Sequence, residues 1–273
     1  MAKALISRST DSPSFIGLGI DVSGSTAHDN IFDLILRALY RILDTLVIRN
    51  TVMDSVKDRV MVSIVAFNSN VYPVFQGFLS DLDEFLTNYD GDNFLRDRPE
   101  ITPRGLTHMG DAISTLADQA QQFAESQRRK GASVPQPVIM IISDGYPEER
   151  NRNDEQARAH VSEEARRAMA IEGDDGNLLL FNIHFNPGST RPELVMPASE
   201  TGINDEDVRF LYSISSTIPD DWIAYAVAQG FSTAVSGSHG MISNARDESQ
   251  LLRFLQFGTL TAPARIRETD FDD

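Results

Sequence analysis

The most regular feature of the sequence is an alternation of short, almost wholly apolar runs with longer amphipathic segments. Phe15–Ile20, Val60–Phe67 and Pro137–Ser143 are apolar at nearly every position, which is typical of strands buried on both faces. After the first run, apolar residues recur at helical spacing, at Ile31, Ile35, Ala38, Leu39, Ile42 and Leu46. Buried strands separated by helices predict a parallel sheet covered on both sides.

The rest of the pattern adds a hairpin and a second set of helices. Asn68-Ser69-Asn70 predicts a tight turn into a strand over Val71–Phe78, which would lie antiparallel at an edge. The predicted fold class is therefore α/β, a doubly wound, mostly parallel sheet with one antiparallel edge strand and helices on both faces. The remaining expected strands are Leu178–Phe185 and His239–Ser243, and the remaining expected helices are Leu82–Leu86, Met109–Arg129, Asp154–Ala170, Asp205–Ser215, Asp220–Gln229 and Asp247–Phe257.

The sequence shows no internal repeat, low-complexity stretch or clear linker. It therefore predicts one domain over 14–260, between a flexible N-terminus, 1–13, and a charged tail, 261–273. The segment Asn186–Asn204, which contains three prolines, is expected to be a loop.

Composition and charge remove several function classes. Forty acidic against twenty-four basic residues give a net charge of −16, which argues against nucleic acid or an anionic membrane as partner. The absence of cysteine excludes disulfides, thiolate catalysis and cysteine-type zinc sites. No run is long and apolar enough for a signal peptide or a membrane span, so we expect a cytoplasmic protein.

Oxygen-bearing side chains follow two of the predicted strands. Asp21, Ser23 and Ser25 come directly after the first strand, and Asp144 follows Pro137–Ser143. Parallel strands bring such ends to one edge of a sheet. Thr107, just before the helix from Met109, is expected at the same edge. Carboxylate and hydroxyl oxygens suit a hard divalent cation, although each segment alone is also typical of a turn or a helix N-cap.

The order and context of Asp21, Ser23, Ser25, Thr107 and Asp144 resemble the metal-ion-dependent adhesion site of von Willebrand factor A (VWA) domains. The resemblance covers about 14–185, and 186–260 diverges from the usual pattern. It implies a Rossmann-like fold and a bound Mg²⁺, with Mn²⁺ or Ca²⁺ as alternatives. It also implies that Ser23, Ser25 and Thr107 are direct ligands, while Asp21 and Asp144 hold the ion mostly through waters.

The same resemblance implies a function in protein binding. The family's metal keeps one position for a carboxylate of another protein, so the chain is expected to be an adaptor or regulatory subunit that docks a partner's Glu or Asp. Without cysteine or a leader, it resembles the family's adhesion receptors less than its bacterial intracellular members, among which the stress-response or tellurium-resistance type is one candidate. Some of these work beside kinases, phosphatases or AAA+ ATPases, which makes such proteins the expected partners.

Two other functions remain open. A metal-assisted phosphoryl-transfer or hydrolytic enzyme could use Asp21 and Asp144, but no nucleophile, base or cationic clamp accompanies them. The second open function is a structural oligomer in which the ion bridges copies of the chain. Gly17-x-Gly19 is a weak match to a dinucleotide-binding loop, because both glycines lie inside a predicted strand.

Overall fold

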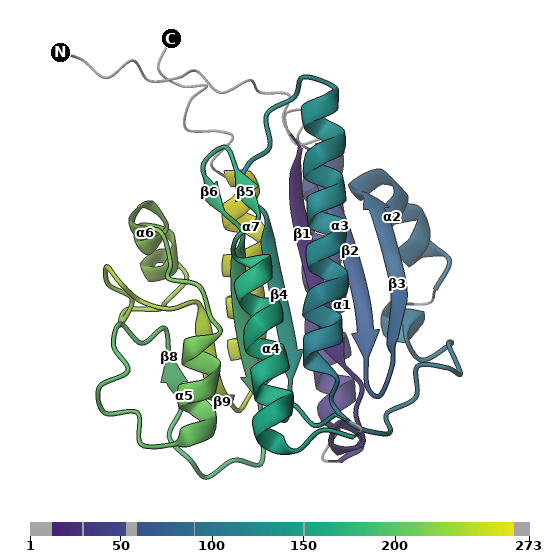
Figure 1. Ribbon diagram of the computed structural model, residues 1–273. Helices are drawn as coiled ribbons and strands as arrows, with labels where there is room; N and C mark the ends of the chain where they lie inside the picture. The colour runs from purple at the N-terminus through teal and green to yellow at the C-terminus, as the bar shows by residue number, and fades with distance from the viewer. Residues whose placement is uncertain (1–12, 29, 53–58, 90, 150, 265–273) are drawn as a thin grey trace, which may run out of the picture.

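The computed structural model describes residues 13–28, 30–52, 59–89, 91–149 and 151–264. Seven strands form one sheet in the order β3-β2-β1-β4-β7-β9-β8 (Figure 1). Most of the expected N-terminal segment 1–13 and of the tail 261–273 lies outside the described residues. Among the described helices, none combines the length and apolar character needed to cross a bilayer. The strands are β1 (Ser14–Asp21), β2 (Val60–Phe67), β3 (Val71–Phe78), β4 (Val138–Ser143), β7 (Leu179–Phe185), β8 (Leu194–Val195) and β9 (Met241–Ala245).

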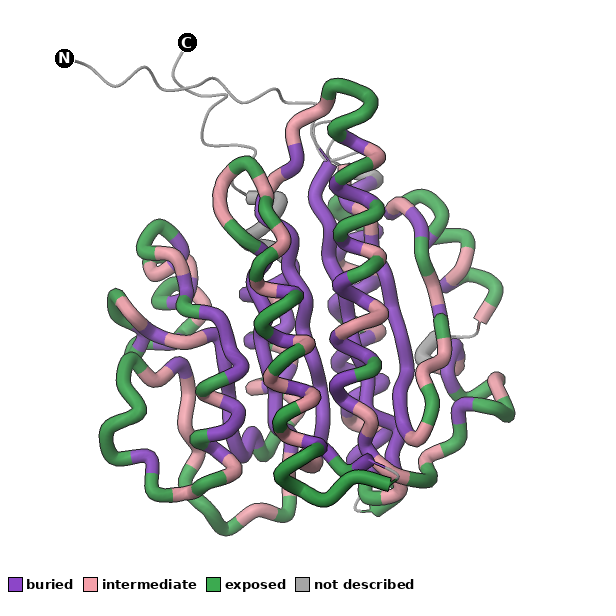
Figure 2. Tube along the Cα trace, viewed as in Figure 1, coloured by how far each residue is buried: buried purple, intermediate pink, exposed green. Residues whose placement is uncertain are grey.

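The centre of the sheet is parallel, as the apolar runs predict. β1 pairs in parallel with β2 on one side and with β4 on the other, and β7 and β9 continue in the same direction. Every residue of β1, β4 and β7 is buried, which Figure 2 shows as a continuous buried centre. The expected antiparallel edge strand is β3, which follows the turn at Asn68-Ser69-Asn70. The predicted fold class is confirmed.

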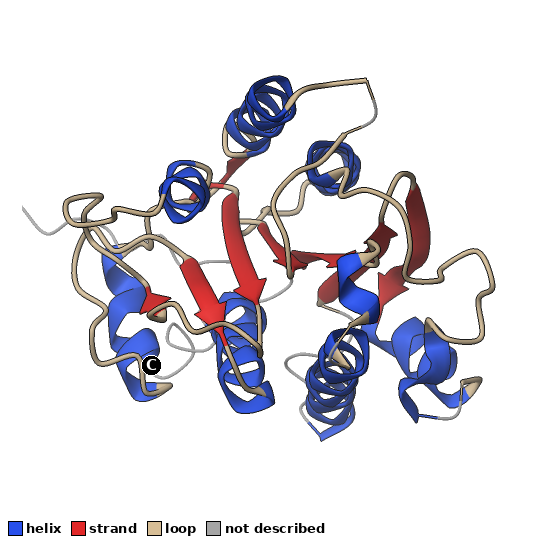
Figure 3. Cartoon of the chain, turned by 90° about the horizontal axis from the view of Figure 1, so that it is seen from below, coloured by secondary structure: helices blue, strands red, loops and turns tan. Residues whose placement is uncertain are grey.

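Helices cover both faces of the sheet (Figure 3). One core cluster joins the sheet to the helices α1 (Ile31–Val52), α2 (Leu79–Thr87), α6 (Asp220–Ala228) and α7 (Glu248–Ala264). The other cluster joins it to α3 (Met109–Arg129), α4 (Asp154–Ala168) and α5 (Glu206–Ser213). This division arises because successive side chains of a strand point to opposite faces.

The glycines of β1 allow α3 to lie close to the sheet. A Cβ atom at Gly17 would be 3.2 Å from Leu116 of α3, and one at Gly19 would be 2.7 Å from Ile141 of β4. The two glycines therefore serve packing in the middle of a strand, which agrees with rejecting them as a dinucleotide-binding loop.

The later part of the chain contains elements that the sequence did not predict. Within the expected loop Asn186–Asn204, β8 pairs antiparallel with β9 at the far edge of the sheet. A small hairpin, β5 (Glu172–Gly173) with β6 (Gly176–Asn177), lies between α4 and β7. Several expected boundaries were wrong. α2 begins at Leu79 rather than Leu82, and β9 begins at Met241 rather than His239. α7 continues beyond Phe257 to Ala264.

Candidate metal-binding site

The five predicted site residues come from three loops at one edge of the sheet. The parallel register pairs Ile20 of β1 with Ile142 of β4, so the chain leaves both strands at the same level, at Asp21 and at Ser143. β2 lies on one side of β1 and β4 lies on the other, so the order of the strands reverses beside β1. Open α/β sheets bind ligands at such a switch point.

The first loop folds around its own polar groups. The backbone N–H of Ser23 donates to Oδ1 of Asp21 at 2.7 Å, and the hydroxyls of Ser23 and Ser25 lie 3.0 Å apart. Thr26 donates its hydroxyl to the Ser23 carbonyl at 2.8 Å, at the start of the short 3₁₀ helix Ser25–Ala27. These bonds hold the Ser23 and Ser25 hydroxyls side by side above the end of β1.

The loop after β4 is joined to the first loop by two side-chain hydrogen bonds. Ser25 donates its hydroxyl to Oδ1 of Asp144 at 2.8 Å. Ser143 donates its hydroxyl to Oδ2 of Asp21 at 2.5 Å, while its oxygen also accepts from the N–H of Gly145 at 3.1 Å. Each aspartate is thus held by a serine of the other loop.

Thr107 reaches the same place on a third loop, which is fixed through its backbone. Its N–H donates to the Glu148 carbonyl at 3.0 Å and its carbonyl accepts from the Glu148 N–H at 3.1 Å. The carbonyl of Gly105 also accepts from the N–H of Gly24 at 3.1 Å. A Cβ atom at Gly145 would lie 3.9 Å from the Ser25 hydroxyl oxygen and 4.0 Å from that of Thr107. Both hydroxyl oxygens therefore lie within 4.0 Å of one point, which the missing side chain of Gly145 leaves open.

The two aspartates carry charge into a poorly solvated place. Burial raises the pKa of Asp21 to about 7, even though hydrogen bonds from Ser143 and Ser23 oppose the shift, and the nearby charge of Asp144 adds to it. Burial also raises the pKa of Asp144, against the hydrogen bond from Ser25. A divalent cation would reverse both shifts, because a nearby positive charge favours the ionised form. The donor set and its electrostatics fit a hard cation.

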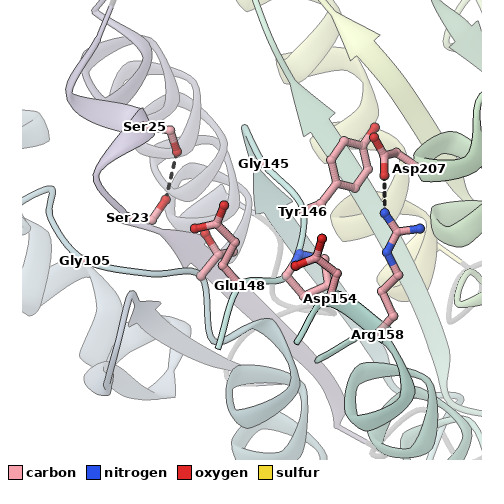
Figure 4. A pocket seen from close by; sticks show the side chains of 11 residues that line it. Ser23, Ser25, Gly105, Gly145, Tyr146, Glu148, Asp154, Arg158 and Asp207 are labelled. Atoms are coloured by element: carbon pink, nitrogen blue, oxygen red, sulfur yellow. Dashed lines mark hydrogen bonds and ion pairs between the residues drawn. The ribbon is translucent and has the colours of Figure 1, made fainter. Parts of the chain in front are cut away.

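The site opens into a cavity of about 420 Å³. In Figure 4 the Ser23 and Ser25 side chains lie on one side of this cavity, and Tyr146, Arg158 and Asp207 lie on the other. The guanidinium of Arg158 is paired with Asp207 and lies 5.4 Å from the ring centre of Phe210. The positively charged Arg158 in the cavity wall therefore already has an anionic partner and an aromatic partner.

Three groups that support the site were not predicted as part of it. The sequence places Ser143 in the oxygen-rich end of the strand before Asp144 but does not predict it as a site residue. His184 of β7 contacts the Asp144 carbonyl through Nε2 at 3.1 Å, and its Nδ1 accepts from the Asn244 N–H at 3.3 Å. Burial lowers the pKa of this histidine. Glu149 is buried beside the loop that holds Thr107. For Ser143 and His184 the available signal was a polar residue at or beside the end of an apolar run, whereas Glu149 carried no such signal.

The described part of the chain contains no cluster of three or more His, Asp or Glu side chains suited to a metal. A cation at this edge would therefore depend on hydroxyl oxygens in addition to the two carboxylates. Of the nearby histidines, His108 directs Nδ1 to Oδ2 of Asp111 at 3.0 Å.

Comparison with known proteins identifies a family. The family model described as von Willebrand factor type A domain matches residues 16–216. No functionally curated protein matches the chain.

Two solved structures with TM-scores above 0.5 share the fold, and a third is less similar. The pilus adhesin SpaC of Lactobacillus rhamnosus GG is 12% identical with a TM-score of 0.54, and the match covers 96% of this chain and 32% of SpaC. A mutant of the PilB minor pilin of Streptococcus sanguinis is 10% identical with a TM-score of 0.53, over 96% and 64% of the two chains. The manganese-loaded TRAP protein of Plasmodium vivax is 19% identical with a TM-score of 0.41, over 63% and 57%.

The chain thus spans between 32% and 64% of the length of these three structures. At such identities the likeness concerns the fold alone.

Proposed function

This chain belongs to the von Willebrand factor type A domain family, and from that premise we propose that it is a metal-dependent protein-binding adaptor or regulatory subunit. Domains of this family often depend on a metal and mediate protein interactions. In the proposed function, a divalent cation held by Asp21, Ser23, Ser25, Thr107 and Asp144 takes a Glu or Asp carboxylate from a partner protein.

One observation carries the proposal, namely that the Ser25 and Thr107 hydroxyl oxygens both lie within 4.0 Å of one open point beside Gly145. Asp144 accepts a hydrogen bond from Ser25 at this point, and Asp21 accepts one from Ser143 beside it. Two neighbouring buried carboxylates need a compensating positive charge. In the described structure their side-chain hydrogen-bond donors are serines, which carry no charge. A bound divalent ion would supply it.

The ion that fits best is Mg²⁺, with Mn²⁺ or Ca²⁺ as alternatives. Few carboxylates, several hydroxyls and room for water suit Mg²⁺, which sheds its water reluctantly and is usually held by one or two carboxylates. Mn²⁺ accepts the same oxygen ligands and is the practical probe, because it is paramagnetic.

An enzymatic function is less well supported. Phosphoryl transfer needs a cationic group or a second metal on the transferred phosphoryl, together with a positioned nucleophile. Arg158 lines the cavity but is paired with Asp207 and Glu206. We therefore propose that the chain is not an enzyme. Turnover of a generic phosphoester with Mg²⁺, abolished by EDTA, would contradict this.

The biological setting is proposed from the resemblance alone. It comprises a cytoplasmic bacterial stress-response protein whose partner is a kinase, phosphatase or AAA+ ATPase. The alternative, self-assembly through the ion, predicts that EDTA changes the particle size measured by light scattering. An adaptor keeps the same particle size with and without chelator.

The test of the proposed function is partner capture by the immobilised chain with Mg²⁺. A true partner is released both by EDTA and by excess acetate, since acetate competes for the metal as a free carboxylate. The variant Asp21→Ala should capture nothing, provided that its melting temperature in EDTA stays near that of the wild type. A partner that is retained by Asp21→Ala, or that survives EDTA, contradicts the proposal.

A further inference from the structure

Glu149 lies at the centre of a side-chain network beside the loop that holds Thr107. Its side chain is only 3% exposed. One carboxylate oxygen contacts Nδ1 of His160 at 2.8 Å, and the other is paired with Arg152. A carboxylate accepts and does not donate, so Nδ1 of His160 carries the proton. Charge-assisted hydrogen bonds are stronger than neutral ones and more specific in geometry, so these two contacts restrain the segment that carries Glu149.

That backbone is the one to which Thr107 is attached. Glu148, the residue before Glu149, makes both backbone hydrogen bonds of Thr107, at 3.0 and 3.1 Å. The side chain of Glu148 itself is exposed. The position of the Thr107 hydroxyl therefore depends on the 148–149 backbone, and the buried anchor of that backbone is the Glu149 carboxylate.

The same network also contacts the helix that follows Thr107. His160 of α4 packs against the first turn of α3, where a Cβ atom at Gly110 would be only 2.6 Å from its Nδ1. Its Nε2 lies 3.8 Å from Oδ1 of Asp111, and Oδ2 of Asp111 contacts His108, the neighbour of Thr107. Thr107 is thus held from both sides by groups that meet at His160.

From this arrangement we propose that Glu149, through His160 and Arg152, is the positioning residue that holds the Thr107 hydroxyl at the metal. The inference rests on the proposed function, in which Thr107 is a direct ligand. Residues that orient a ligand through a second layer of hydrogen bonds typically change metal affinity by about 10–100-fold when replaced. Loss of the Glu149 anchor should let the Thr107 loop withdraw and a water take its place.

The experiment compares Mn²⁺ binding by the wild type and by Glu149→Gln, with two readouts. The first is the dissociation constant, expected to rise about tenfold or more in the variant. The second is water-proton relaxation by bound Mn²⁺, expected to increase by the contribution of one added water. This second readout distinguishes a lost ligand from a general loosening of the fold, which would not add a coordinated water.

Two further variants make the result decisive. Glu164→Gln removes a glutamate that pairs with Arg167 on the same helix, away from the site, and should bind Mn²⁺ as the wild type does. Arg152→Gln removes the ion pair between the half-exposed Arg152 and the same carboxylate. It should give an intermediate loss of Mn²⁺ affinity, and it still tests the proposal if Glu149→Gln folds poorly.

The outcomes separate the two ideas. If the wild type binds Mn²⁺ but Glu149→Gln and Arg152→Gln bind it equally well, or bind it more weakly with unchanged relaxation, the positioning role is wrong while the metal site stands. If the wild type binds no Mn²⁺, the proposed metal site itself is wrong, and the role of Glu149 with it.

Discussion

The Ser25 hydroxyl donates to Oδ1 of Asp144 across 2.8 Å, joining residues 119 positions apart in the chain. In the opposite direction, Ser143 of the second loop donates to Asp21 of the first. Two loops that each read as an ordinary turn in the sequence are thereby locked into one polar cluster. The cluster contains two carboxylates of raised pKa, which is an arrangement that a cation stabilises.

Replacing Asp21 should separate metal binding from folding. Asp21→Asn keeps an acceptor for the Ser23 N–H but removes the buried charge. With Mg²⁺ at about 100 times its dissociation constant, the wild type should gain about 2.7 kcal/mol in the free energy of unfolding, and the variant almost none. In EDTA at pH 8, the variant should melt at least as high as the wild type, because the buried carboxylate of Asp21 no longer has to ionise. Thermal melts with and without Mg²⁺ check both statements. An equal gain from Mg²⁺ in the two proteins would contradict the account.

The hydroxyl of Thr107 should matter more than its methyl group. Thr107→Ser keeps the oxygen, and Thr107→Ala removes it while the backbone pairing with Glu148 is untouched. We expect Thr107→Ala to weaken Mn²⁺ binding by about tenfold or more, by analogy with lost groups around a metal, and Thr107→Ser to stay near the wild type. Calorimetric titration of the three proteins measures this. Similar losses in both variants would indicate packing instead of ligation.

The benefit of Mg²⁺ should depend on pH in a definite direction. Because burial raises the pKa of Asp21 from 3.8 to about 7, the metal-free fold favours the protonated form, and that contribution to stability is lost as pH rises from about 4 through 7. Mg²⁺ requires the ionised form, so below pH 7 it must displace a proton. The rise in melting temperature on adding Mg²⁺ should therefore be larger at pH 8 than at pH 5.5. A rise that is equal at both values would show that Asp21 does not titrate with the metal.

Ser143 should affect the metal although it is not a proposed ligand. Ser143→Ala removes the 2.5 Å hydrogen bond that Asp21 accepts, so the ionised form of Asp21 becomes less favourable and Mg²⁺ affinity at pH 7 should fall several-fold. Ser63→Ala is the matched control, since Ser63 is also a buried strand serine but donates to Gln119. Mg²⁺ titration of both variants gives the comparison. Equal affinities would mean that Ser143 has no part in the site.

The core of the fold and the position of the site could be predicted because they follow from patterns local in the sequence. Runs such as Phe15–Ile20 are apolar throughout because both faces of the sheet are covered. The carboxyl end of such a strand is a defined place, so Asp21 and Asp144 could be assigned to one edge before any contact between them was known.

What could not be predicted depends on contacts between distant segments. β8 has only two residues, Leu194 and Val195, and it exists because it pairs with β9, for which its own sequence carries no signal. The same holds for Glu149, which is of a residue type usually found at the surface. Its buried carboxylate is paired with His160 of the following helix, α4. Tertiary packing decides such elements, and single-sequence patterns do not record it.

The central claim is that these three loops hold one divalent cation, and a Mn²⁺ titration followed by electron paramagnetic resonance tests it most directly. The account predicts one saturable Mn²⁺ per chain, displaced by Mg²⁺, and its loss in the double variant Ser23→Ala/Ser25→Ala. No saturable binding by the wild type, or undiminished binding by the double variant, would contradict it.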